Sequence, residues 1–221
     1  MPNPMTGQPM LGGDQSSLLN DLFKAWGVEV VADKFVADLA MAQRVQTGRS
    51  GPAAVVDYIP WLAIQGERLN RDDVVTSELT QINVASIGAI RKLDGAATTL
   101  TPLVTSSDQA MLMDTADLKG DPDPQALAGK FKPTGETYVL AARITGNAKT
   151  AFPDGAPKKE GEAKEGEAKA AAPAAEQVKE SAKPINVMLV ADADLLDDRF
   201  WVRQQQMFGQ SLYVPIAANA D

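Results

Sequence analysis

The 221-residue sequence contains neither histidine nor cysteine. Without these residues, the serine–histidine and cysteine–histidine pairs that activate a nucleophile are excluded. Zinc sites built from thiolates or imidazoles are excluded for the same reason, so only metal sites with oxygen ligands remain open. The absence of thiols leaves the redox compartment undetermined, because a chain without cysteine is compatible with both oxidising and reducing surroundings.

Positive charge and long apolar runs are also scarce. The chain has 21 basic and 29 acidic residues, a net charge of −8, which argues against nucleic acid and anionic membrane surfaces as partners. The N-terminus lacks the basic cluster and apolar run of a signal peptide, and the apolar stretch at 187–191 is too short to cross a bilayer. We therefore expect a soluble chain with a core mainly of Val, Ile, Leu and Ala, since aromatic residues make up only 5%.

Low-complexity sequence separates two parts of the chain. The pentapeptide KEGEA occurs at 159–163 and again at 164–168, and residues 154–183 contain six Lys against seven Asp and Glu. Such a segment buries too little apolar area to offset its ordering entropy, so 153–184 is predicted to be a disordered insertion. It is either a tether for a partner or, as we favour, a neutral surface insertion. Residues 1–14 are predicted to be a flexible tail, and 15–221 a single interrupted domain.

The pattern of apolar residues predicts an α/β fold. Helices are expected over 15–26, ended by Gly27, within 69–82 and over 200–208; strands are expected over 28–35, 41–45, 55–64, 84–93, 98–106, 137–145 and 184–190. Residues 114–133 are expected to form a loop with one helical turn near Ala126. The continuous apolar run at 184–190 is typical of a strand buried on both faces. Together these elements predict a central, mostly parallel or mixed sheet flanked by helices.

Asp192 and Asp194 are the strongest candidates for chemistry. They follow the expected strand at 184–190, and two carboxylates in a DxD pattern can hold Mg²⁺ or Mn²⁺ in a phosphotransferase or hydrolase. The alternative is structural: an Asp after a strand often caps a turn or helix, and Asp197 and Asp198 would then favour the start of the helix near Phe200. We favour the structural role, with no cofactor and no catalysis.

Other polar and aromatic residues are given structural roles. Arg143, in an expected strand, is predicted to face solvent or pair with a carboxylate. The side chains of Trp26, Trp61 and Trp201 are predicted to be core anchors rather than a stack for a cofactor.

Several segments resemble the auxiliary domain of GldG-like proteins, accessory subunits of ABC-type transporters linked to gliding motility. They are LLNDLFKAWGVEVVADKFVADLAMAQRV, DYIPWLAI, LNRDDVVTSELTQINVASIGAI, TPLVTSSDQA, YVLAARITGNAKTAFPDG and INVMLVADADLLDDRFWV. The resemblance implies an extracytoplasmic (periplasmic) α/β domain related to flavodoxin-like folds, with permease and ATPase partners and membrane anchors outside this chain, which we interpret as a fragment. It implies a non-catalytic scaffolding or substrate-handling function. Our candidates for the partner interface are Asp197, Asp198, Arg199 and Trp201.

Overall fold

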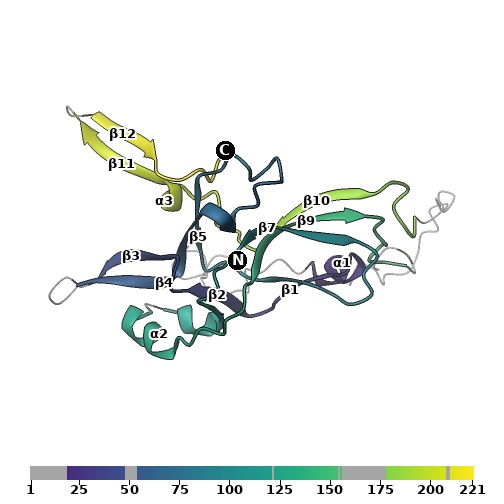
Figure 1. Ribbon diagram of the computed structural model, residues 1–221, viewed down its shortest axis with the longest axis horizontal. Coiled ribbons are helices and arrows are strands. Elements are labelled where there is room, and N and C mark those ends of the chain that lie inside the picture. Colours follow the sequence, from purple (N-terminus) through teal and green to yellow (C-terminus); the bar gives the residue numbers. More distant parts are fainter. Residues whose placement is uncertain (1–18, 48–53, 121, 154, 156–177, 208–209) are drawn as a thin grey trace, which may run out of the picture.

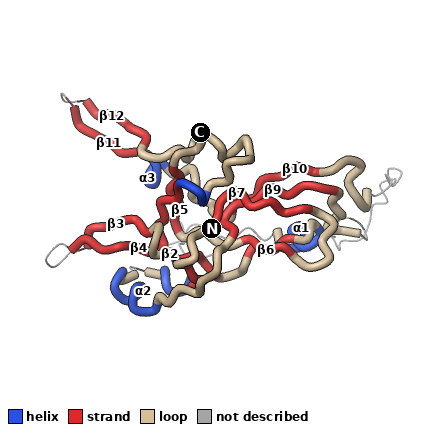
Figure 2. The backbone as a smooth tube through the Cα atoms, in the orientation of Figure 1, coloured by secondary structure: helices blue, strands red, loops and turns tan. Residues whose placement is uncertain are grey.

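The computed structural model describes residues 19–47, 54–120, 122–153, 155, 178–207 and 210–221, and strands dominate them (Figure 1, Figure 2). The helices are α1 (Asn20–Ala25), α2 (Pro124–Lys130) and α3 (Asp198–Trp201), with 3-10 turns η1 (Gly66–Arg68) and η2 (Thr115–Leu118). The strands are β1 (Val28–Val30), β2 (Lys34–Asp38), β3 (Ala42–Thr47), β4 (Ala54–Gln65), β5 (Gln81–Ala85), β6 (Ile90–Lys92), β7 (Thr99–Thr105), β8 (Ala110–Asp114), β9 (Val139–Gly146), β10 (Ile185–Val190), β11 (Val202–Met207) and β12 (Gln210–Pro215).

These strands form four antiparallel sheets. Strands β1, β6, β7, β9 and β10 form the largest, in which β9 pairs with β6, β7 and β10; the others are β3–β4–β5, β2–β8 and β11–β12. The predicted α/β fold with a mostly parallel, flavodoxin-like sheet is therefore wrong. Parallel pairing needs a crossover of a dozen or more residues, usually helical, whereas the longest described helix, α2, has seven residues.

Three apolar clusters hold the sheets together. The largest includes Leu62 of β4, Val84 of β5 and Leu140 of β9, each with no exposed surface, and therefore joins the three-stranded sheet to the five-stranded one. A second cluster packs Leu127 of α2 against Phe35, Ile59 and Met113, and a third packs Phe23 of α1 against Val28 and Ile144. Burial of a large apolar side chain contributes about 1.5–3 kcal/mol, so these clusters supply the main stabilising free energy.

Gly27 ends α1 as the sequence predicts. Its φ is +71°, a left-handed conformation, and an added Cβ would lie only 2.1 Å from the Cβ of Ala96. Glycine is the residue that adopts this conformation without a steric penalty. The close approach lets the chain turn directly from α1 into β1.

The predicted helix within 69–82 is wrong, because local side chains bind the backbone of this segment. Asn70 Oδ1 accepts a hydrogen bond from the Asp72 N–H, and Asp73 Oδ1 accepts one from the Val75 N–H. The Arg71 guanidinium donates to the carbonyls of Ser77 and Leu79. These bonds compete with helical hydrogen bonds, so residues 70–79 form an ordered loop.

Two predictions near the C-terminus are also wrong. The expected helix over 200–208 ends at Trp201, and the following residues form β11 and pair with β12 from Val202↔Pro215 to Met207↔Gln210. Strand β10 is not buried on both faces: its residues alternate between half-buried and exposed. Among the described strands it pairs with β9 alone, at the edge of its sheet, and the face that carries Met188 and Val190 is not covered by another element.

Other sequence predictions are confirmed. Strands β4, β7 and β9 lie where the apolar patterns at 55–64, 98–106 and 137–145 predict them, and α2 supplies the helical turn near Ala126. The C-terminal end of the predicted insertion at 153–184 is ordered, however, because Glu180 pairs with Lys149 and the Lys179 carbonyl accepts the Thr150 N–H at 2.9 Å, which continues the β9–β10 hairpin. Most of the insertion, 156–177, and the predicted tail, 1–14, lie outside the described residues.

Candidate functional site

Asp192 and Asp194 form a turn after β10. Asp192 Oδ1 accepts the Asp194 N–H at 2.7 Å, and its Oδ2 accepts the Ala85 N–H of β5 at 3.4 Å. Burial raises the pKa of Asp192, because removing a carboxylate from water disfavours its charged form. Asp194 is exposed. Within the described ranges, no group of three or more acidic side chains gathers where it could hold a metal ion.

Asp197, Asp198, Arg199 and Trp201 lie together on α3 and its N-terminal cap. Asp197 Oδ1 accepts the Arg199 N–H at 3.0 Å, which caps the helix, and Arg199 Nη2 donates to Asp197 Oδ2 at 2.6 Å. The Arg199 side chain lowers the pKa of Asp197 to about 2. Asp198 and Arg199 are exposed, and Trp201 is half-buried with its ring N–H directed at the Leu196 carbonyl. Trp201 is therefore neither a core residue nor a fully exposed anchor.

Aromatic rings connect α3 to the three-stranded sheet. The ring of Trp61 on β4 meets Phe200 of α3 edge to face at 5.5 Å and Tyr58 at 5.3 Å, and Trp61 is itself 36% exposed. Edge-to-face pairs contribute about 0.5–1.5 kcal/mol beyond burial. The contacts of Tyr58, Trp61 and Phe200 therefore hold α3, which directly precedes the C-terminal strands, against β4.

Strands β11 and β12 form a two-stranded ribbon that projects away from the rest of the molecule (Figure 1). Leu212 and Val214 share one face and Tyr213 lies on the other, and they are 41%, 37% and 70% exposed. Gln204 and Gln206 both donate to Ser211 Oγ, and the Ile216 N–H donates to the Trp201 carbonyl to close the base. The ribbon was not predicted from the sequence, although the β-rich run LYVP at 212–215 is a hairpin signal.

A pair of asparagines anchors the segment that follows the ribbon. Asn219 Nδ2 donates to the carbonyls of Asn83 and Leu195, and Asn219 Oδ1 accepts the Asn83 N–H. Asn83 Nδ2 in turn donates to the Phe200 carbonyl at 2.7 Å. The two side chains therefore link β5 to α3 and to the C-terminal segment, and both are buried.

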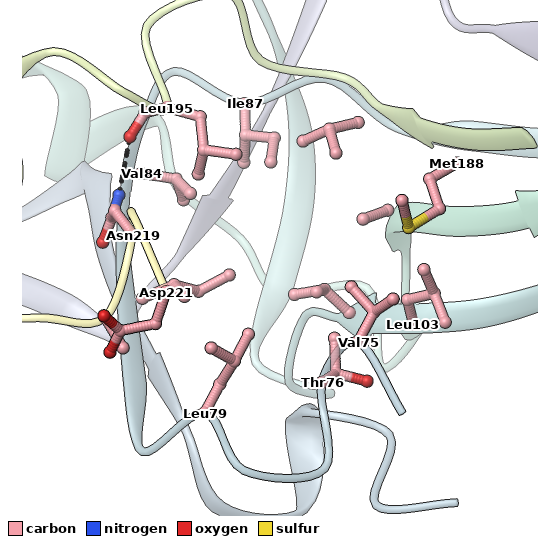
Figure 3. Close-up of a pocket in the computed structure, with 15 residues that line it drawn as sticks. Val75, Thr76, Leu79, Val84, Ile87, Leu103, Met188, Leu195, Asn219 and Asp221 are labelled. Carbon is pink, nitrogen blue, oxygen red and sulfur yellow. Dashed lines mark hydrogen bonds between the residues drawn. The ribbon is translucent and has the colours of Figure 1, made fainter. Parts of the chain in front are cut away.

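Beside this anchor lies an apolar cavity of about 180 Å³ (Figure 3). Its lining is Val75, Thr76, Leu79, Ile82, Val84, Ile87, Leu103, Val104, Ala141, Met188, Val190, Leu195, Ala218, Asn219 and Asp221. In Figure 3, Met188 and Val75 lie on the side opposite Asn219 and Asp221. The exposed face of β10, with Met188 and Val190, forms part of the rim of the cavity. This exposed face was not predicted from the sequence.

The loop at 70–79, which forms one wall of the cavity, is held by an ion pair. Arg143 of β9 donates from Nε and Nη2 to the two carboxylate oxygens of Asp73, both at 2.7 Å, and from Nη1 to Asn186 Oδ1 at 2.6 Å. The Arg143 guanidinium lowers the pKa of Asp73 to about 2. The expected pairing of Arg143 with a carboxylate is confirmed, and it connects the loop to β9 and β10.

The described architecture is that of an antiparallel β protein with a projecting ribbon and a preformed apolar cavity. Over residues 1–221 the chain matches the family described as an ABC-type uncharacterized transport system, and it belongs to that family. It is thus an auxiliary component of an ABC-type transport system. No curated protein and no solved structure gives a significant match. No described helix has the length and apolar character needed to span a membrane.

Proposed function

We propose that this chain is a non-catalytic docking domain of its transport system and that α3 with the ribbon β11–β12 is its partner-binding surface. The single observation that carries the proposal is the projecting ribbon, whose apolar side chains Leu212, Tyr213 and Val214 are exposed. Leu212 and Val214 share one face of the ribbon, and exposed apolar side chains that lie together mark interaction sites in soluble proteins. An isolated two-stranded hairpin is also marginally stable in water, so contact with a partner would stabilise it.

The charge of the ribbon favours a protein partner with an apolar surface. Arg203 is the only charged residue in the described parts of β11 and β12. Removing neutral side chains from water costs less than removing charged ones, so this surface is readily desolvated. At its base, Asp198 and Arg199 are exposed and supply the polar rim that a protein interface usually has.

The partners in this proposal are the permease and ATPase subunits of the transport system, and the proposed role is scaffolding or substrate handling on the extracytoplasmic side. A link to gliding motility follows from the resemblance to GldG-like proteins and belongs to the same proposal. The domain is proposed to span 15–221 with an insertion at 153–184. The DxD phosphotransferase alternative has less support, because both carboxylate oxygens of Asp192 accept backbone N–H groups.

The ribbon assignment is tested with a charge placed on its exposed surface. Full-length protein carrying Tyr213→Asp should recover much less permease and ATPase than the unmodified protein when it is affinity-purified from its native membrane. Val55→Asp is the matched control, since Val55 is 67% exposed on β4, outside the ribbon and α3. Equal recovery with Tyr213→Asp and Val55→Asp would refute the ribbon as the docking surface.

A further inference from the structure

The apolar cavity has a closed floor and an open rim. Its floor includes Val84, Ile87 and Leu103, which are 0%, 1% and 3% exposed. Its rim includes Val75 and Met188, which are 41% and 51% exposed. Apolar surface therefore continues from the interior of the cavity onto the surface around it. In protein interfaces, the side chains that contribute most to binding often sit in such pockets, and the surrounding rim keeps water away from them.

The size and polarity of the cavity indicate its occupant. Small-molecule sites usually measure about 300–1,000 Å³ and present polar groups that orient the ligand. This cavity is about 180 Å³, close to the roughly 150 Å³ that holds one benzene molecule. The polar groups of Thr76 and Asn219 in its lining are already bonded to backbone groups. Its dimensions suit one aromatic or branched aliphatic side chain.

Charge further restricts the occupant. Asp221 is an exposed residue of the lining and the only charged one in it. The whole chain carries a net charge of −8. A segment with Lys or Arg near its apolar side chain would complement this rim, and such complementarity favours one partner over others.

The cavity is also held open before any partner arrives. The loop at 70–79 is fixed by Arg71, which donates to the Ser77 and Leu79 carbonyls, and by the bidentate Arg143–Asp73 pair. Asn219 fixes the opposite wall through its bond to the Leu195 carbonyl at 2.8 Å (Figure 3). A preformed pocket reduces the ordering cost of binding.

We propose that this cavity is a second contact point, which receives one bulky apolar side chain, with a basic residue close to it, from a partner subunit of the transport system. The proposal rests on the proposed docking function and adds to it a site separate from the ribbon. The cavity lies between the loop at 70–79, β5, β7, β9 and β10, whereas the ribbon consists of β11 and β12. The two surfaces can therefore be tested independently.

Single cysteines give a direct test, because the natural chain has none. Met188→Cys reports the rim of the cavity, Tyr213→Cys the ribbon, and Val55→Cys a surface outside both. Maleimide alkylation of each full-length variant is measured alone and in the complex purified with permease and ATPase. We expect the complex to slow alkylation of Met188→Cys at least about tenfold and to leave Val55→Cys unchanged.

The possible outcomes separate this inference from the proposed function. Protection of Tyr213→Cys without protection of Met188→Cys would overturn the cavity site and leave the ribbon assignment standing. Protection of neither, or failure to recover any partner, would overturn both. Concentration-dependent protection of Met188→Cys in the isolated protein would identify a second copy as the occupant and would also overturn the inference.

Two further variants test occupation of the cavity itself. Ala141→Leu fills the floor from a 5% exposed position and leaves the rim unchanged, so it should weaken binding of the permease and ATPase about tenfold or more without loss of folding. Met188→Lys places a positive charge on the rim and should have a similar effect, whereas Val55→Lys should change binding less than about twofold. Unchanged binding by both Ala141→Leu and Met188→Lys would contradict the proposal.

Discussion

Replacement of Asn219 by alanine tests how the C-terminal segment is held. Asn219 is 8% exposed, and its amide makes three hydrogen bonds, two with the Asn83 backbone and one with the Leu195 carbonyl. Asn219→Ala would remove all three bonds and take these partners from the N–H and C=O of the buried Asn83. Each hydrogen bond contributes about 0.5–1.5 kcal/mol net, so we expect a loss of about 2–4 kcal/mol in the free energy of unfolding.

The measurement is urea-induced unfolding, analysed by linear extrapolation and followed by circular dichroism. Asn147→Ala is the control, because Asn147 is exposed and should change the stability by less than about 0.5 kcal/mol. A loss below about 0.5 kcal/mol for Asn219→Ala would refute the role of this side chain as an anchor.

Asn219→Asp provides a more specific version of the same test. Its size is almost that of asparagine, but at neutral pH it replaces an NH₂ donor with a carboxylate oxygen that faces the Asn83 and Leu195 carbonyls. We expect it to be at least as destabilising as Asn219→Ala at pH 7. Part of the loss should be recovered below about pH 4, where the carboxyl group is protonated and regains a donor.

Three other predictions follow from the structure. Asp192→Ala should lower the free energy of unfolding by about 1 kcal/mol because it loses the hydrogen bonds from the Asp194 and Ala85 N–H groups, and Asp192→Asn should cost less, since its amide oxygen still accepts one of the two while its NH₂ group cannot accept the other. Neither change should remove a Mg²⁺- or Mn²⁺-dependent turnover, and calorimetry that shows tight metal binding abolished by Asp192→Asn would contradict this. Arg143 lowers the pKa of Asp73 to about 2, so the natural protein should be more stable than Arg143→Met by a constant amount above pH 3.8, the usual pKa of Asp, and the difference should shrink as the pH falls toward 2. A difference in unfolding free energy that stays constant from pH 3.8 to pH 2, measured with urea, would refute the pairing. A short Gly/Ser loop in place of 156–177 should change the unfolding free energy by less than about 1–2 kcal/mol, because the Lys149–Glu180 pairing brings the flanks together; cooperative loss of structure would show that the segment is a packed element.

Local apolar patterns predicted the strands with strong periodicity and failed where polar side chains act on the backbone. The run at 55–64 contains residues that alternate between core and surface, and it forms β4 as expected. At 69–82, Val75, Leu79 and Ile82 have helical spacing, but Asn70 and Asp73 bind neighbouring N–H groups and prevent a helix. Competition of this kind depends on side-chain geometry that a hydrophobic pattern does not contain.

Which strands pair with each other, and in which direction, could not be predicted from the apolar pattern of the sequence. The apolar run of β10 was expected to be buried on both faces, but one face is half-buried and the other leaves Met188 51% exposed. Antiparallel and parallel sheets differ in which distant strands meet, and that choice depends on the connections as well as on periodicity. The cavity was equally unpredictable, because its lining comes from segments as far apart as Val75 and Asp221.

At the candidate interface, the sequence predicted a capped helix start but not the ribbon that follows it. Asp197 was expected near a helix start and caps α3 through the Arg199 N–H. The neighbouring residues 202–207 were expected to continue that helix, and they instead form one strand of the ribbon. The ribbon is formed by the antiparallel pairing of β11 with β12, from Val202↔Pro215 to Met207↔Gln210, and Gln204 and Gln206 add side-chain bonds to Ser211 across it.

The most direct test of the docking role is the composition of the complex that the full-length protein forms in its native membrane. Affinity purification under conditions that preserve other transporter complexes, followed by quantitative mass spectrometry, measures which subunits accompany it and in what ratio. The docking role predicts permease and ATPase subunits of one ABC-type system at a fixed stoichiometry. Recovery of the protein without either subunit would contradict it.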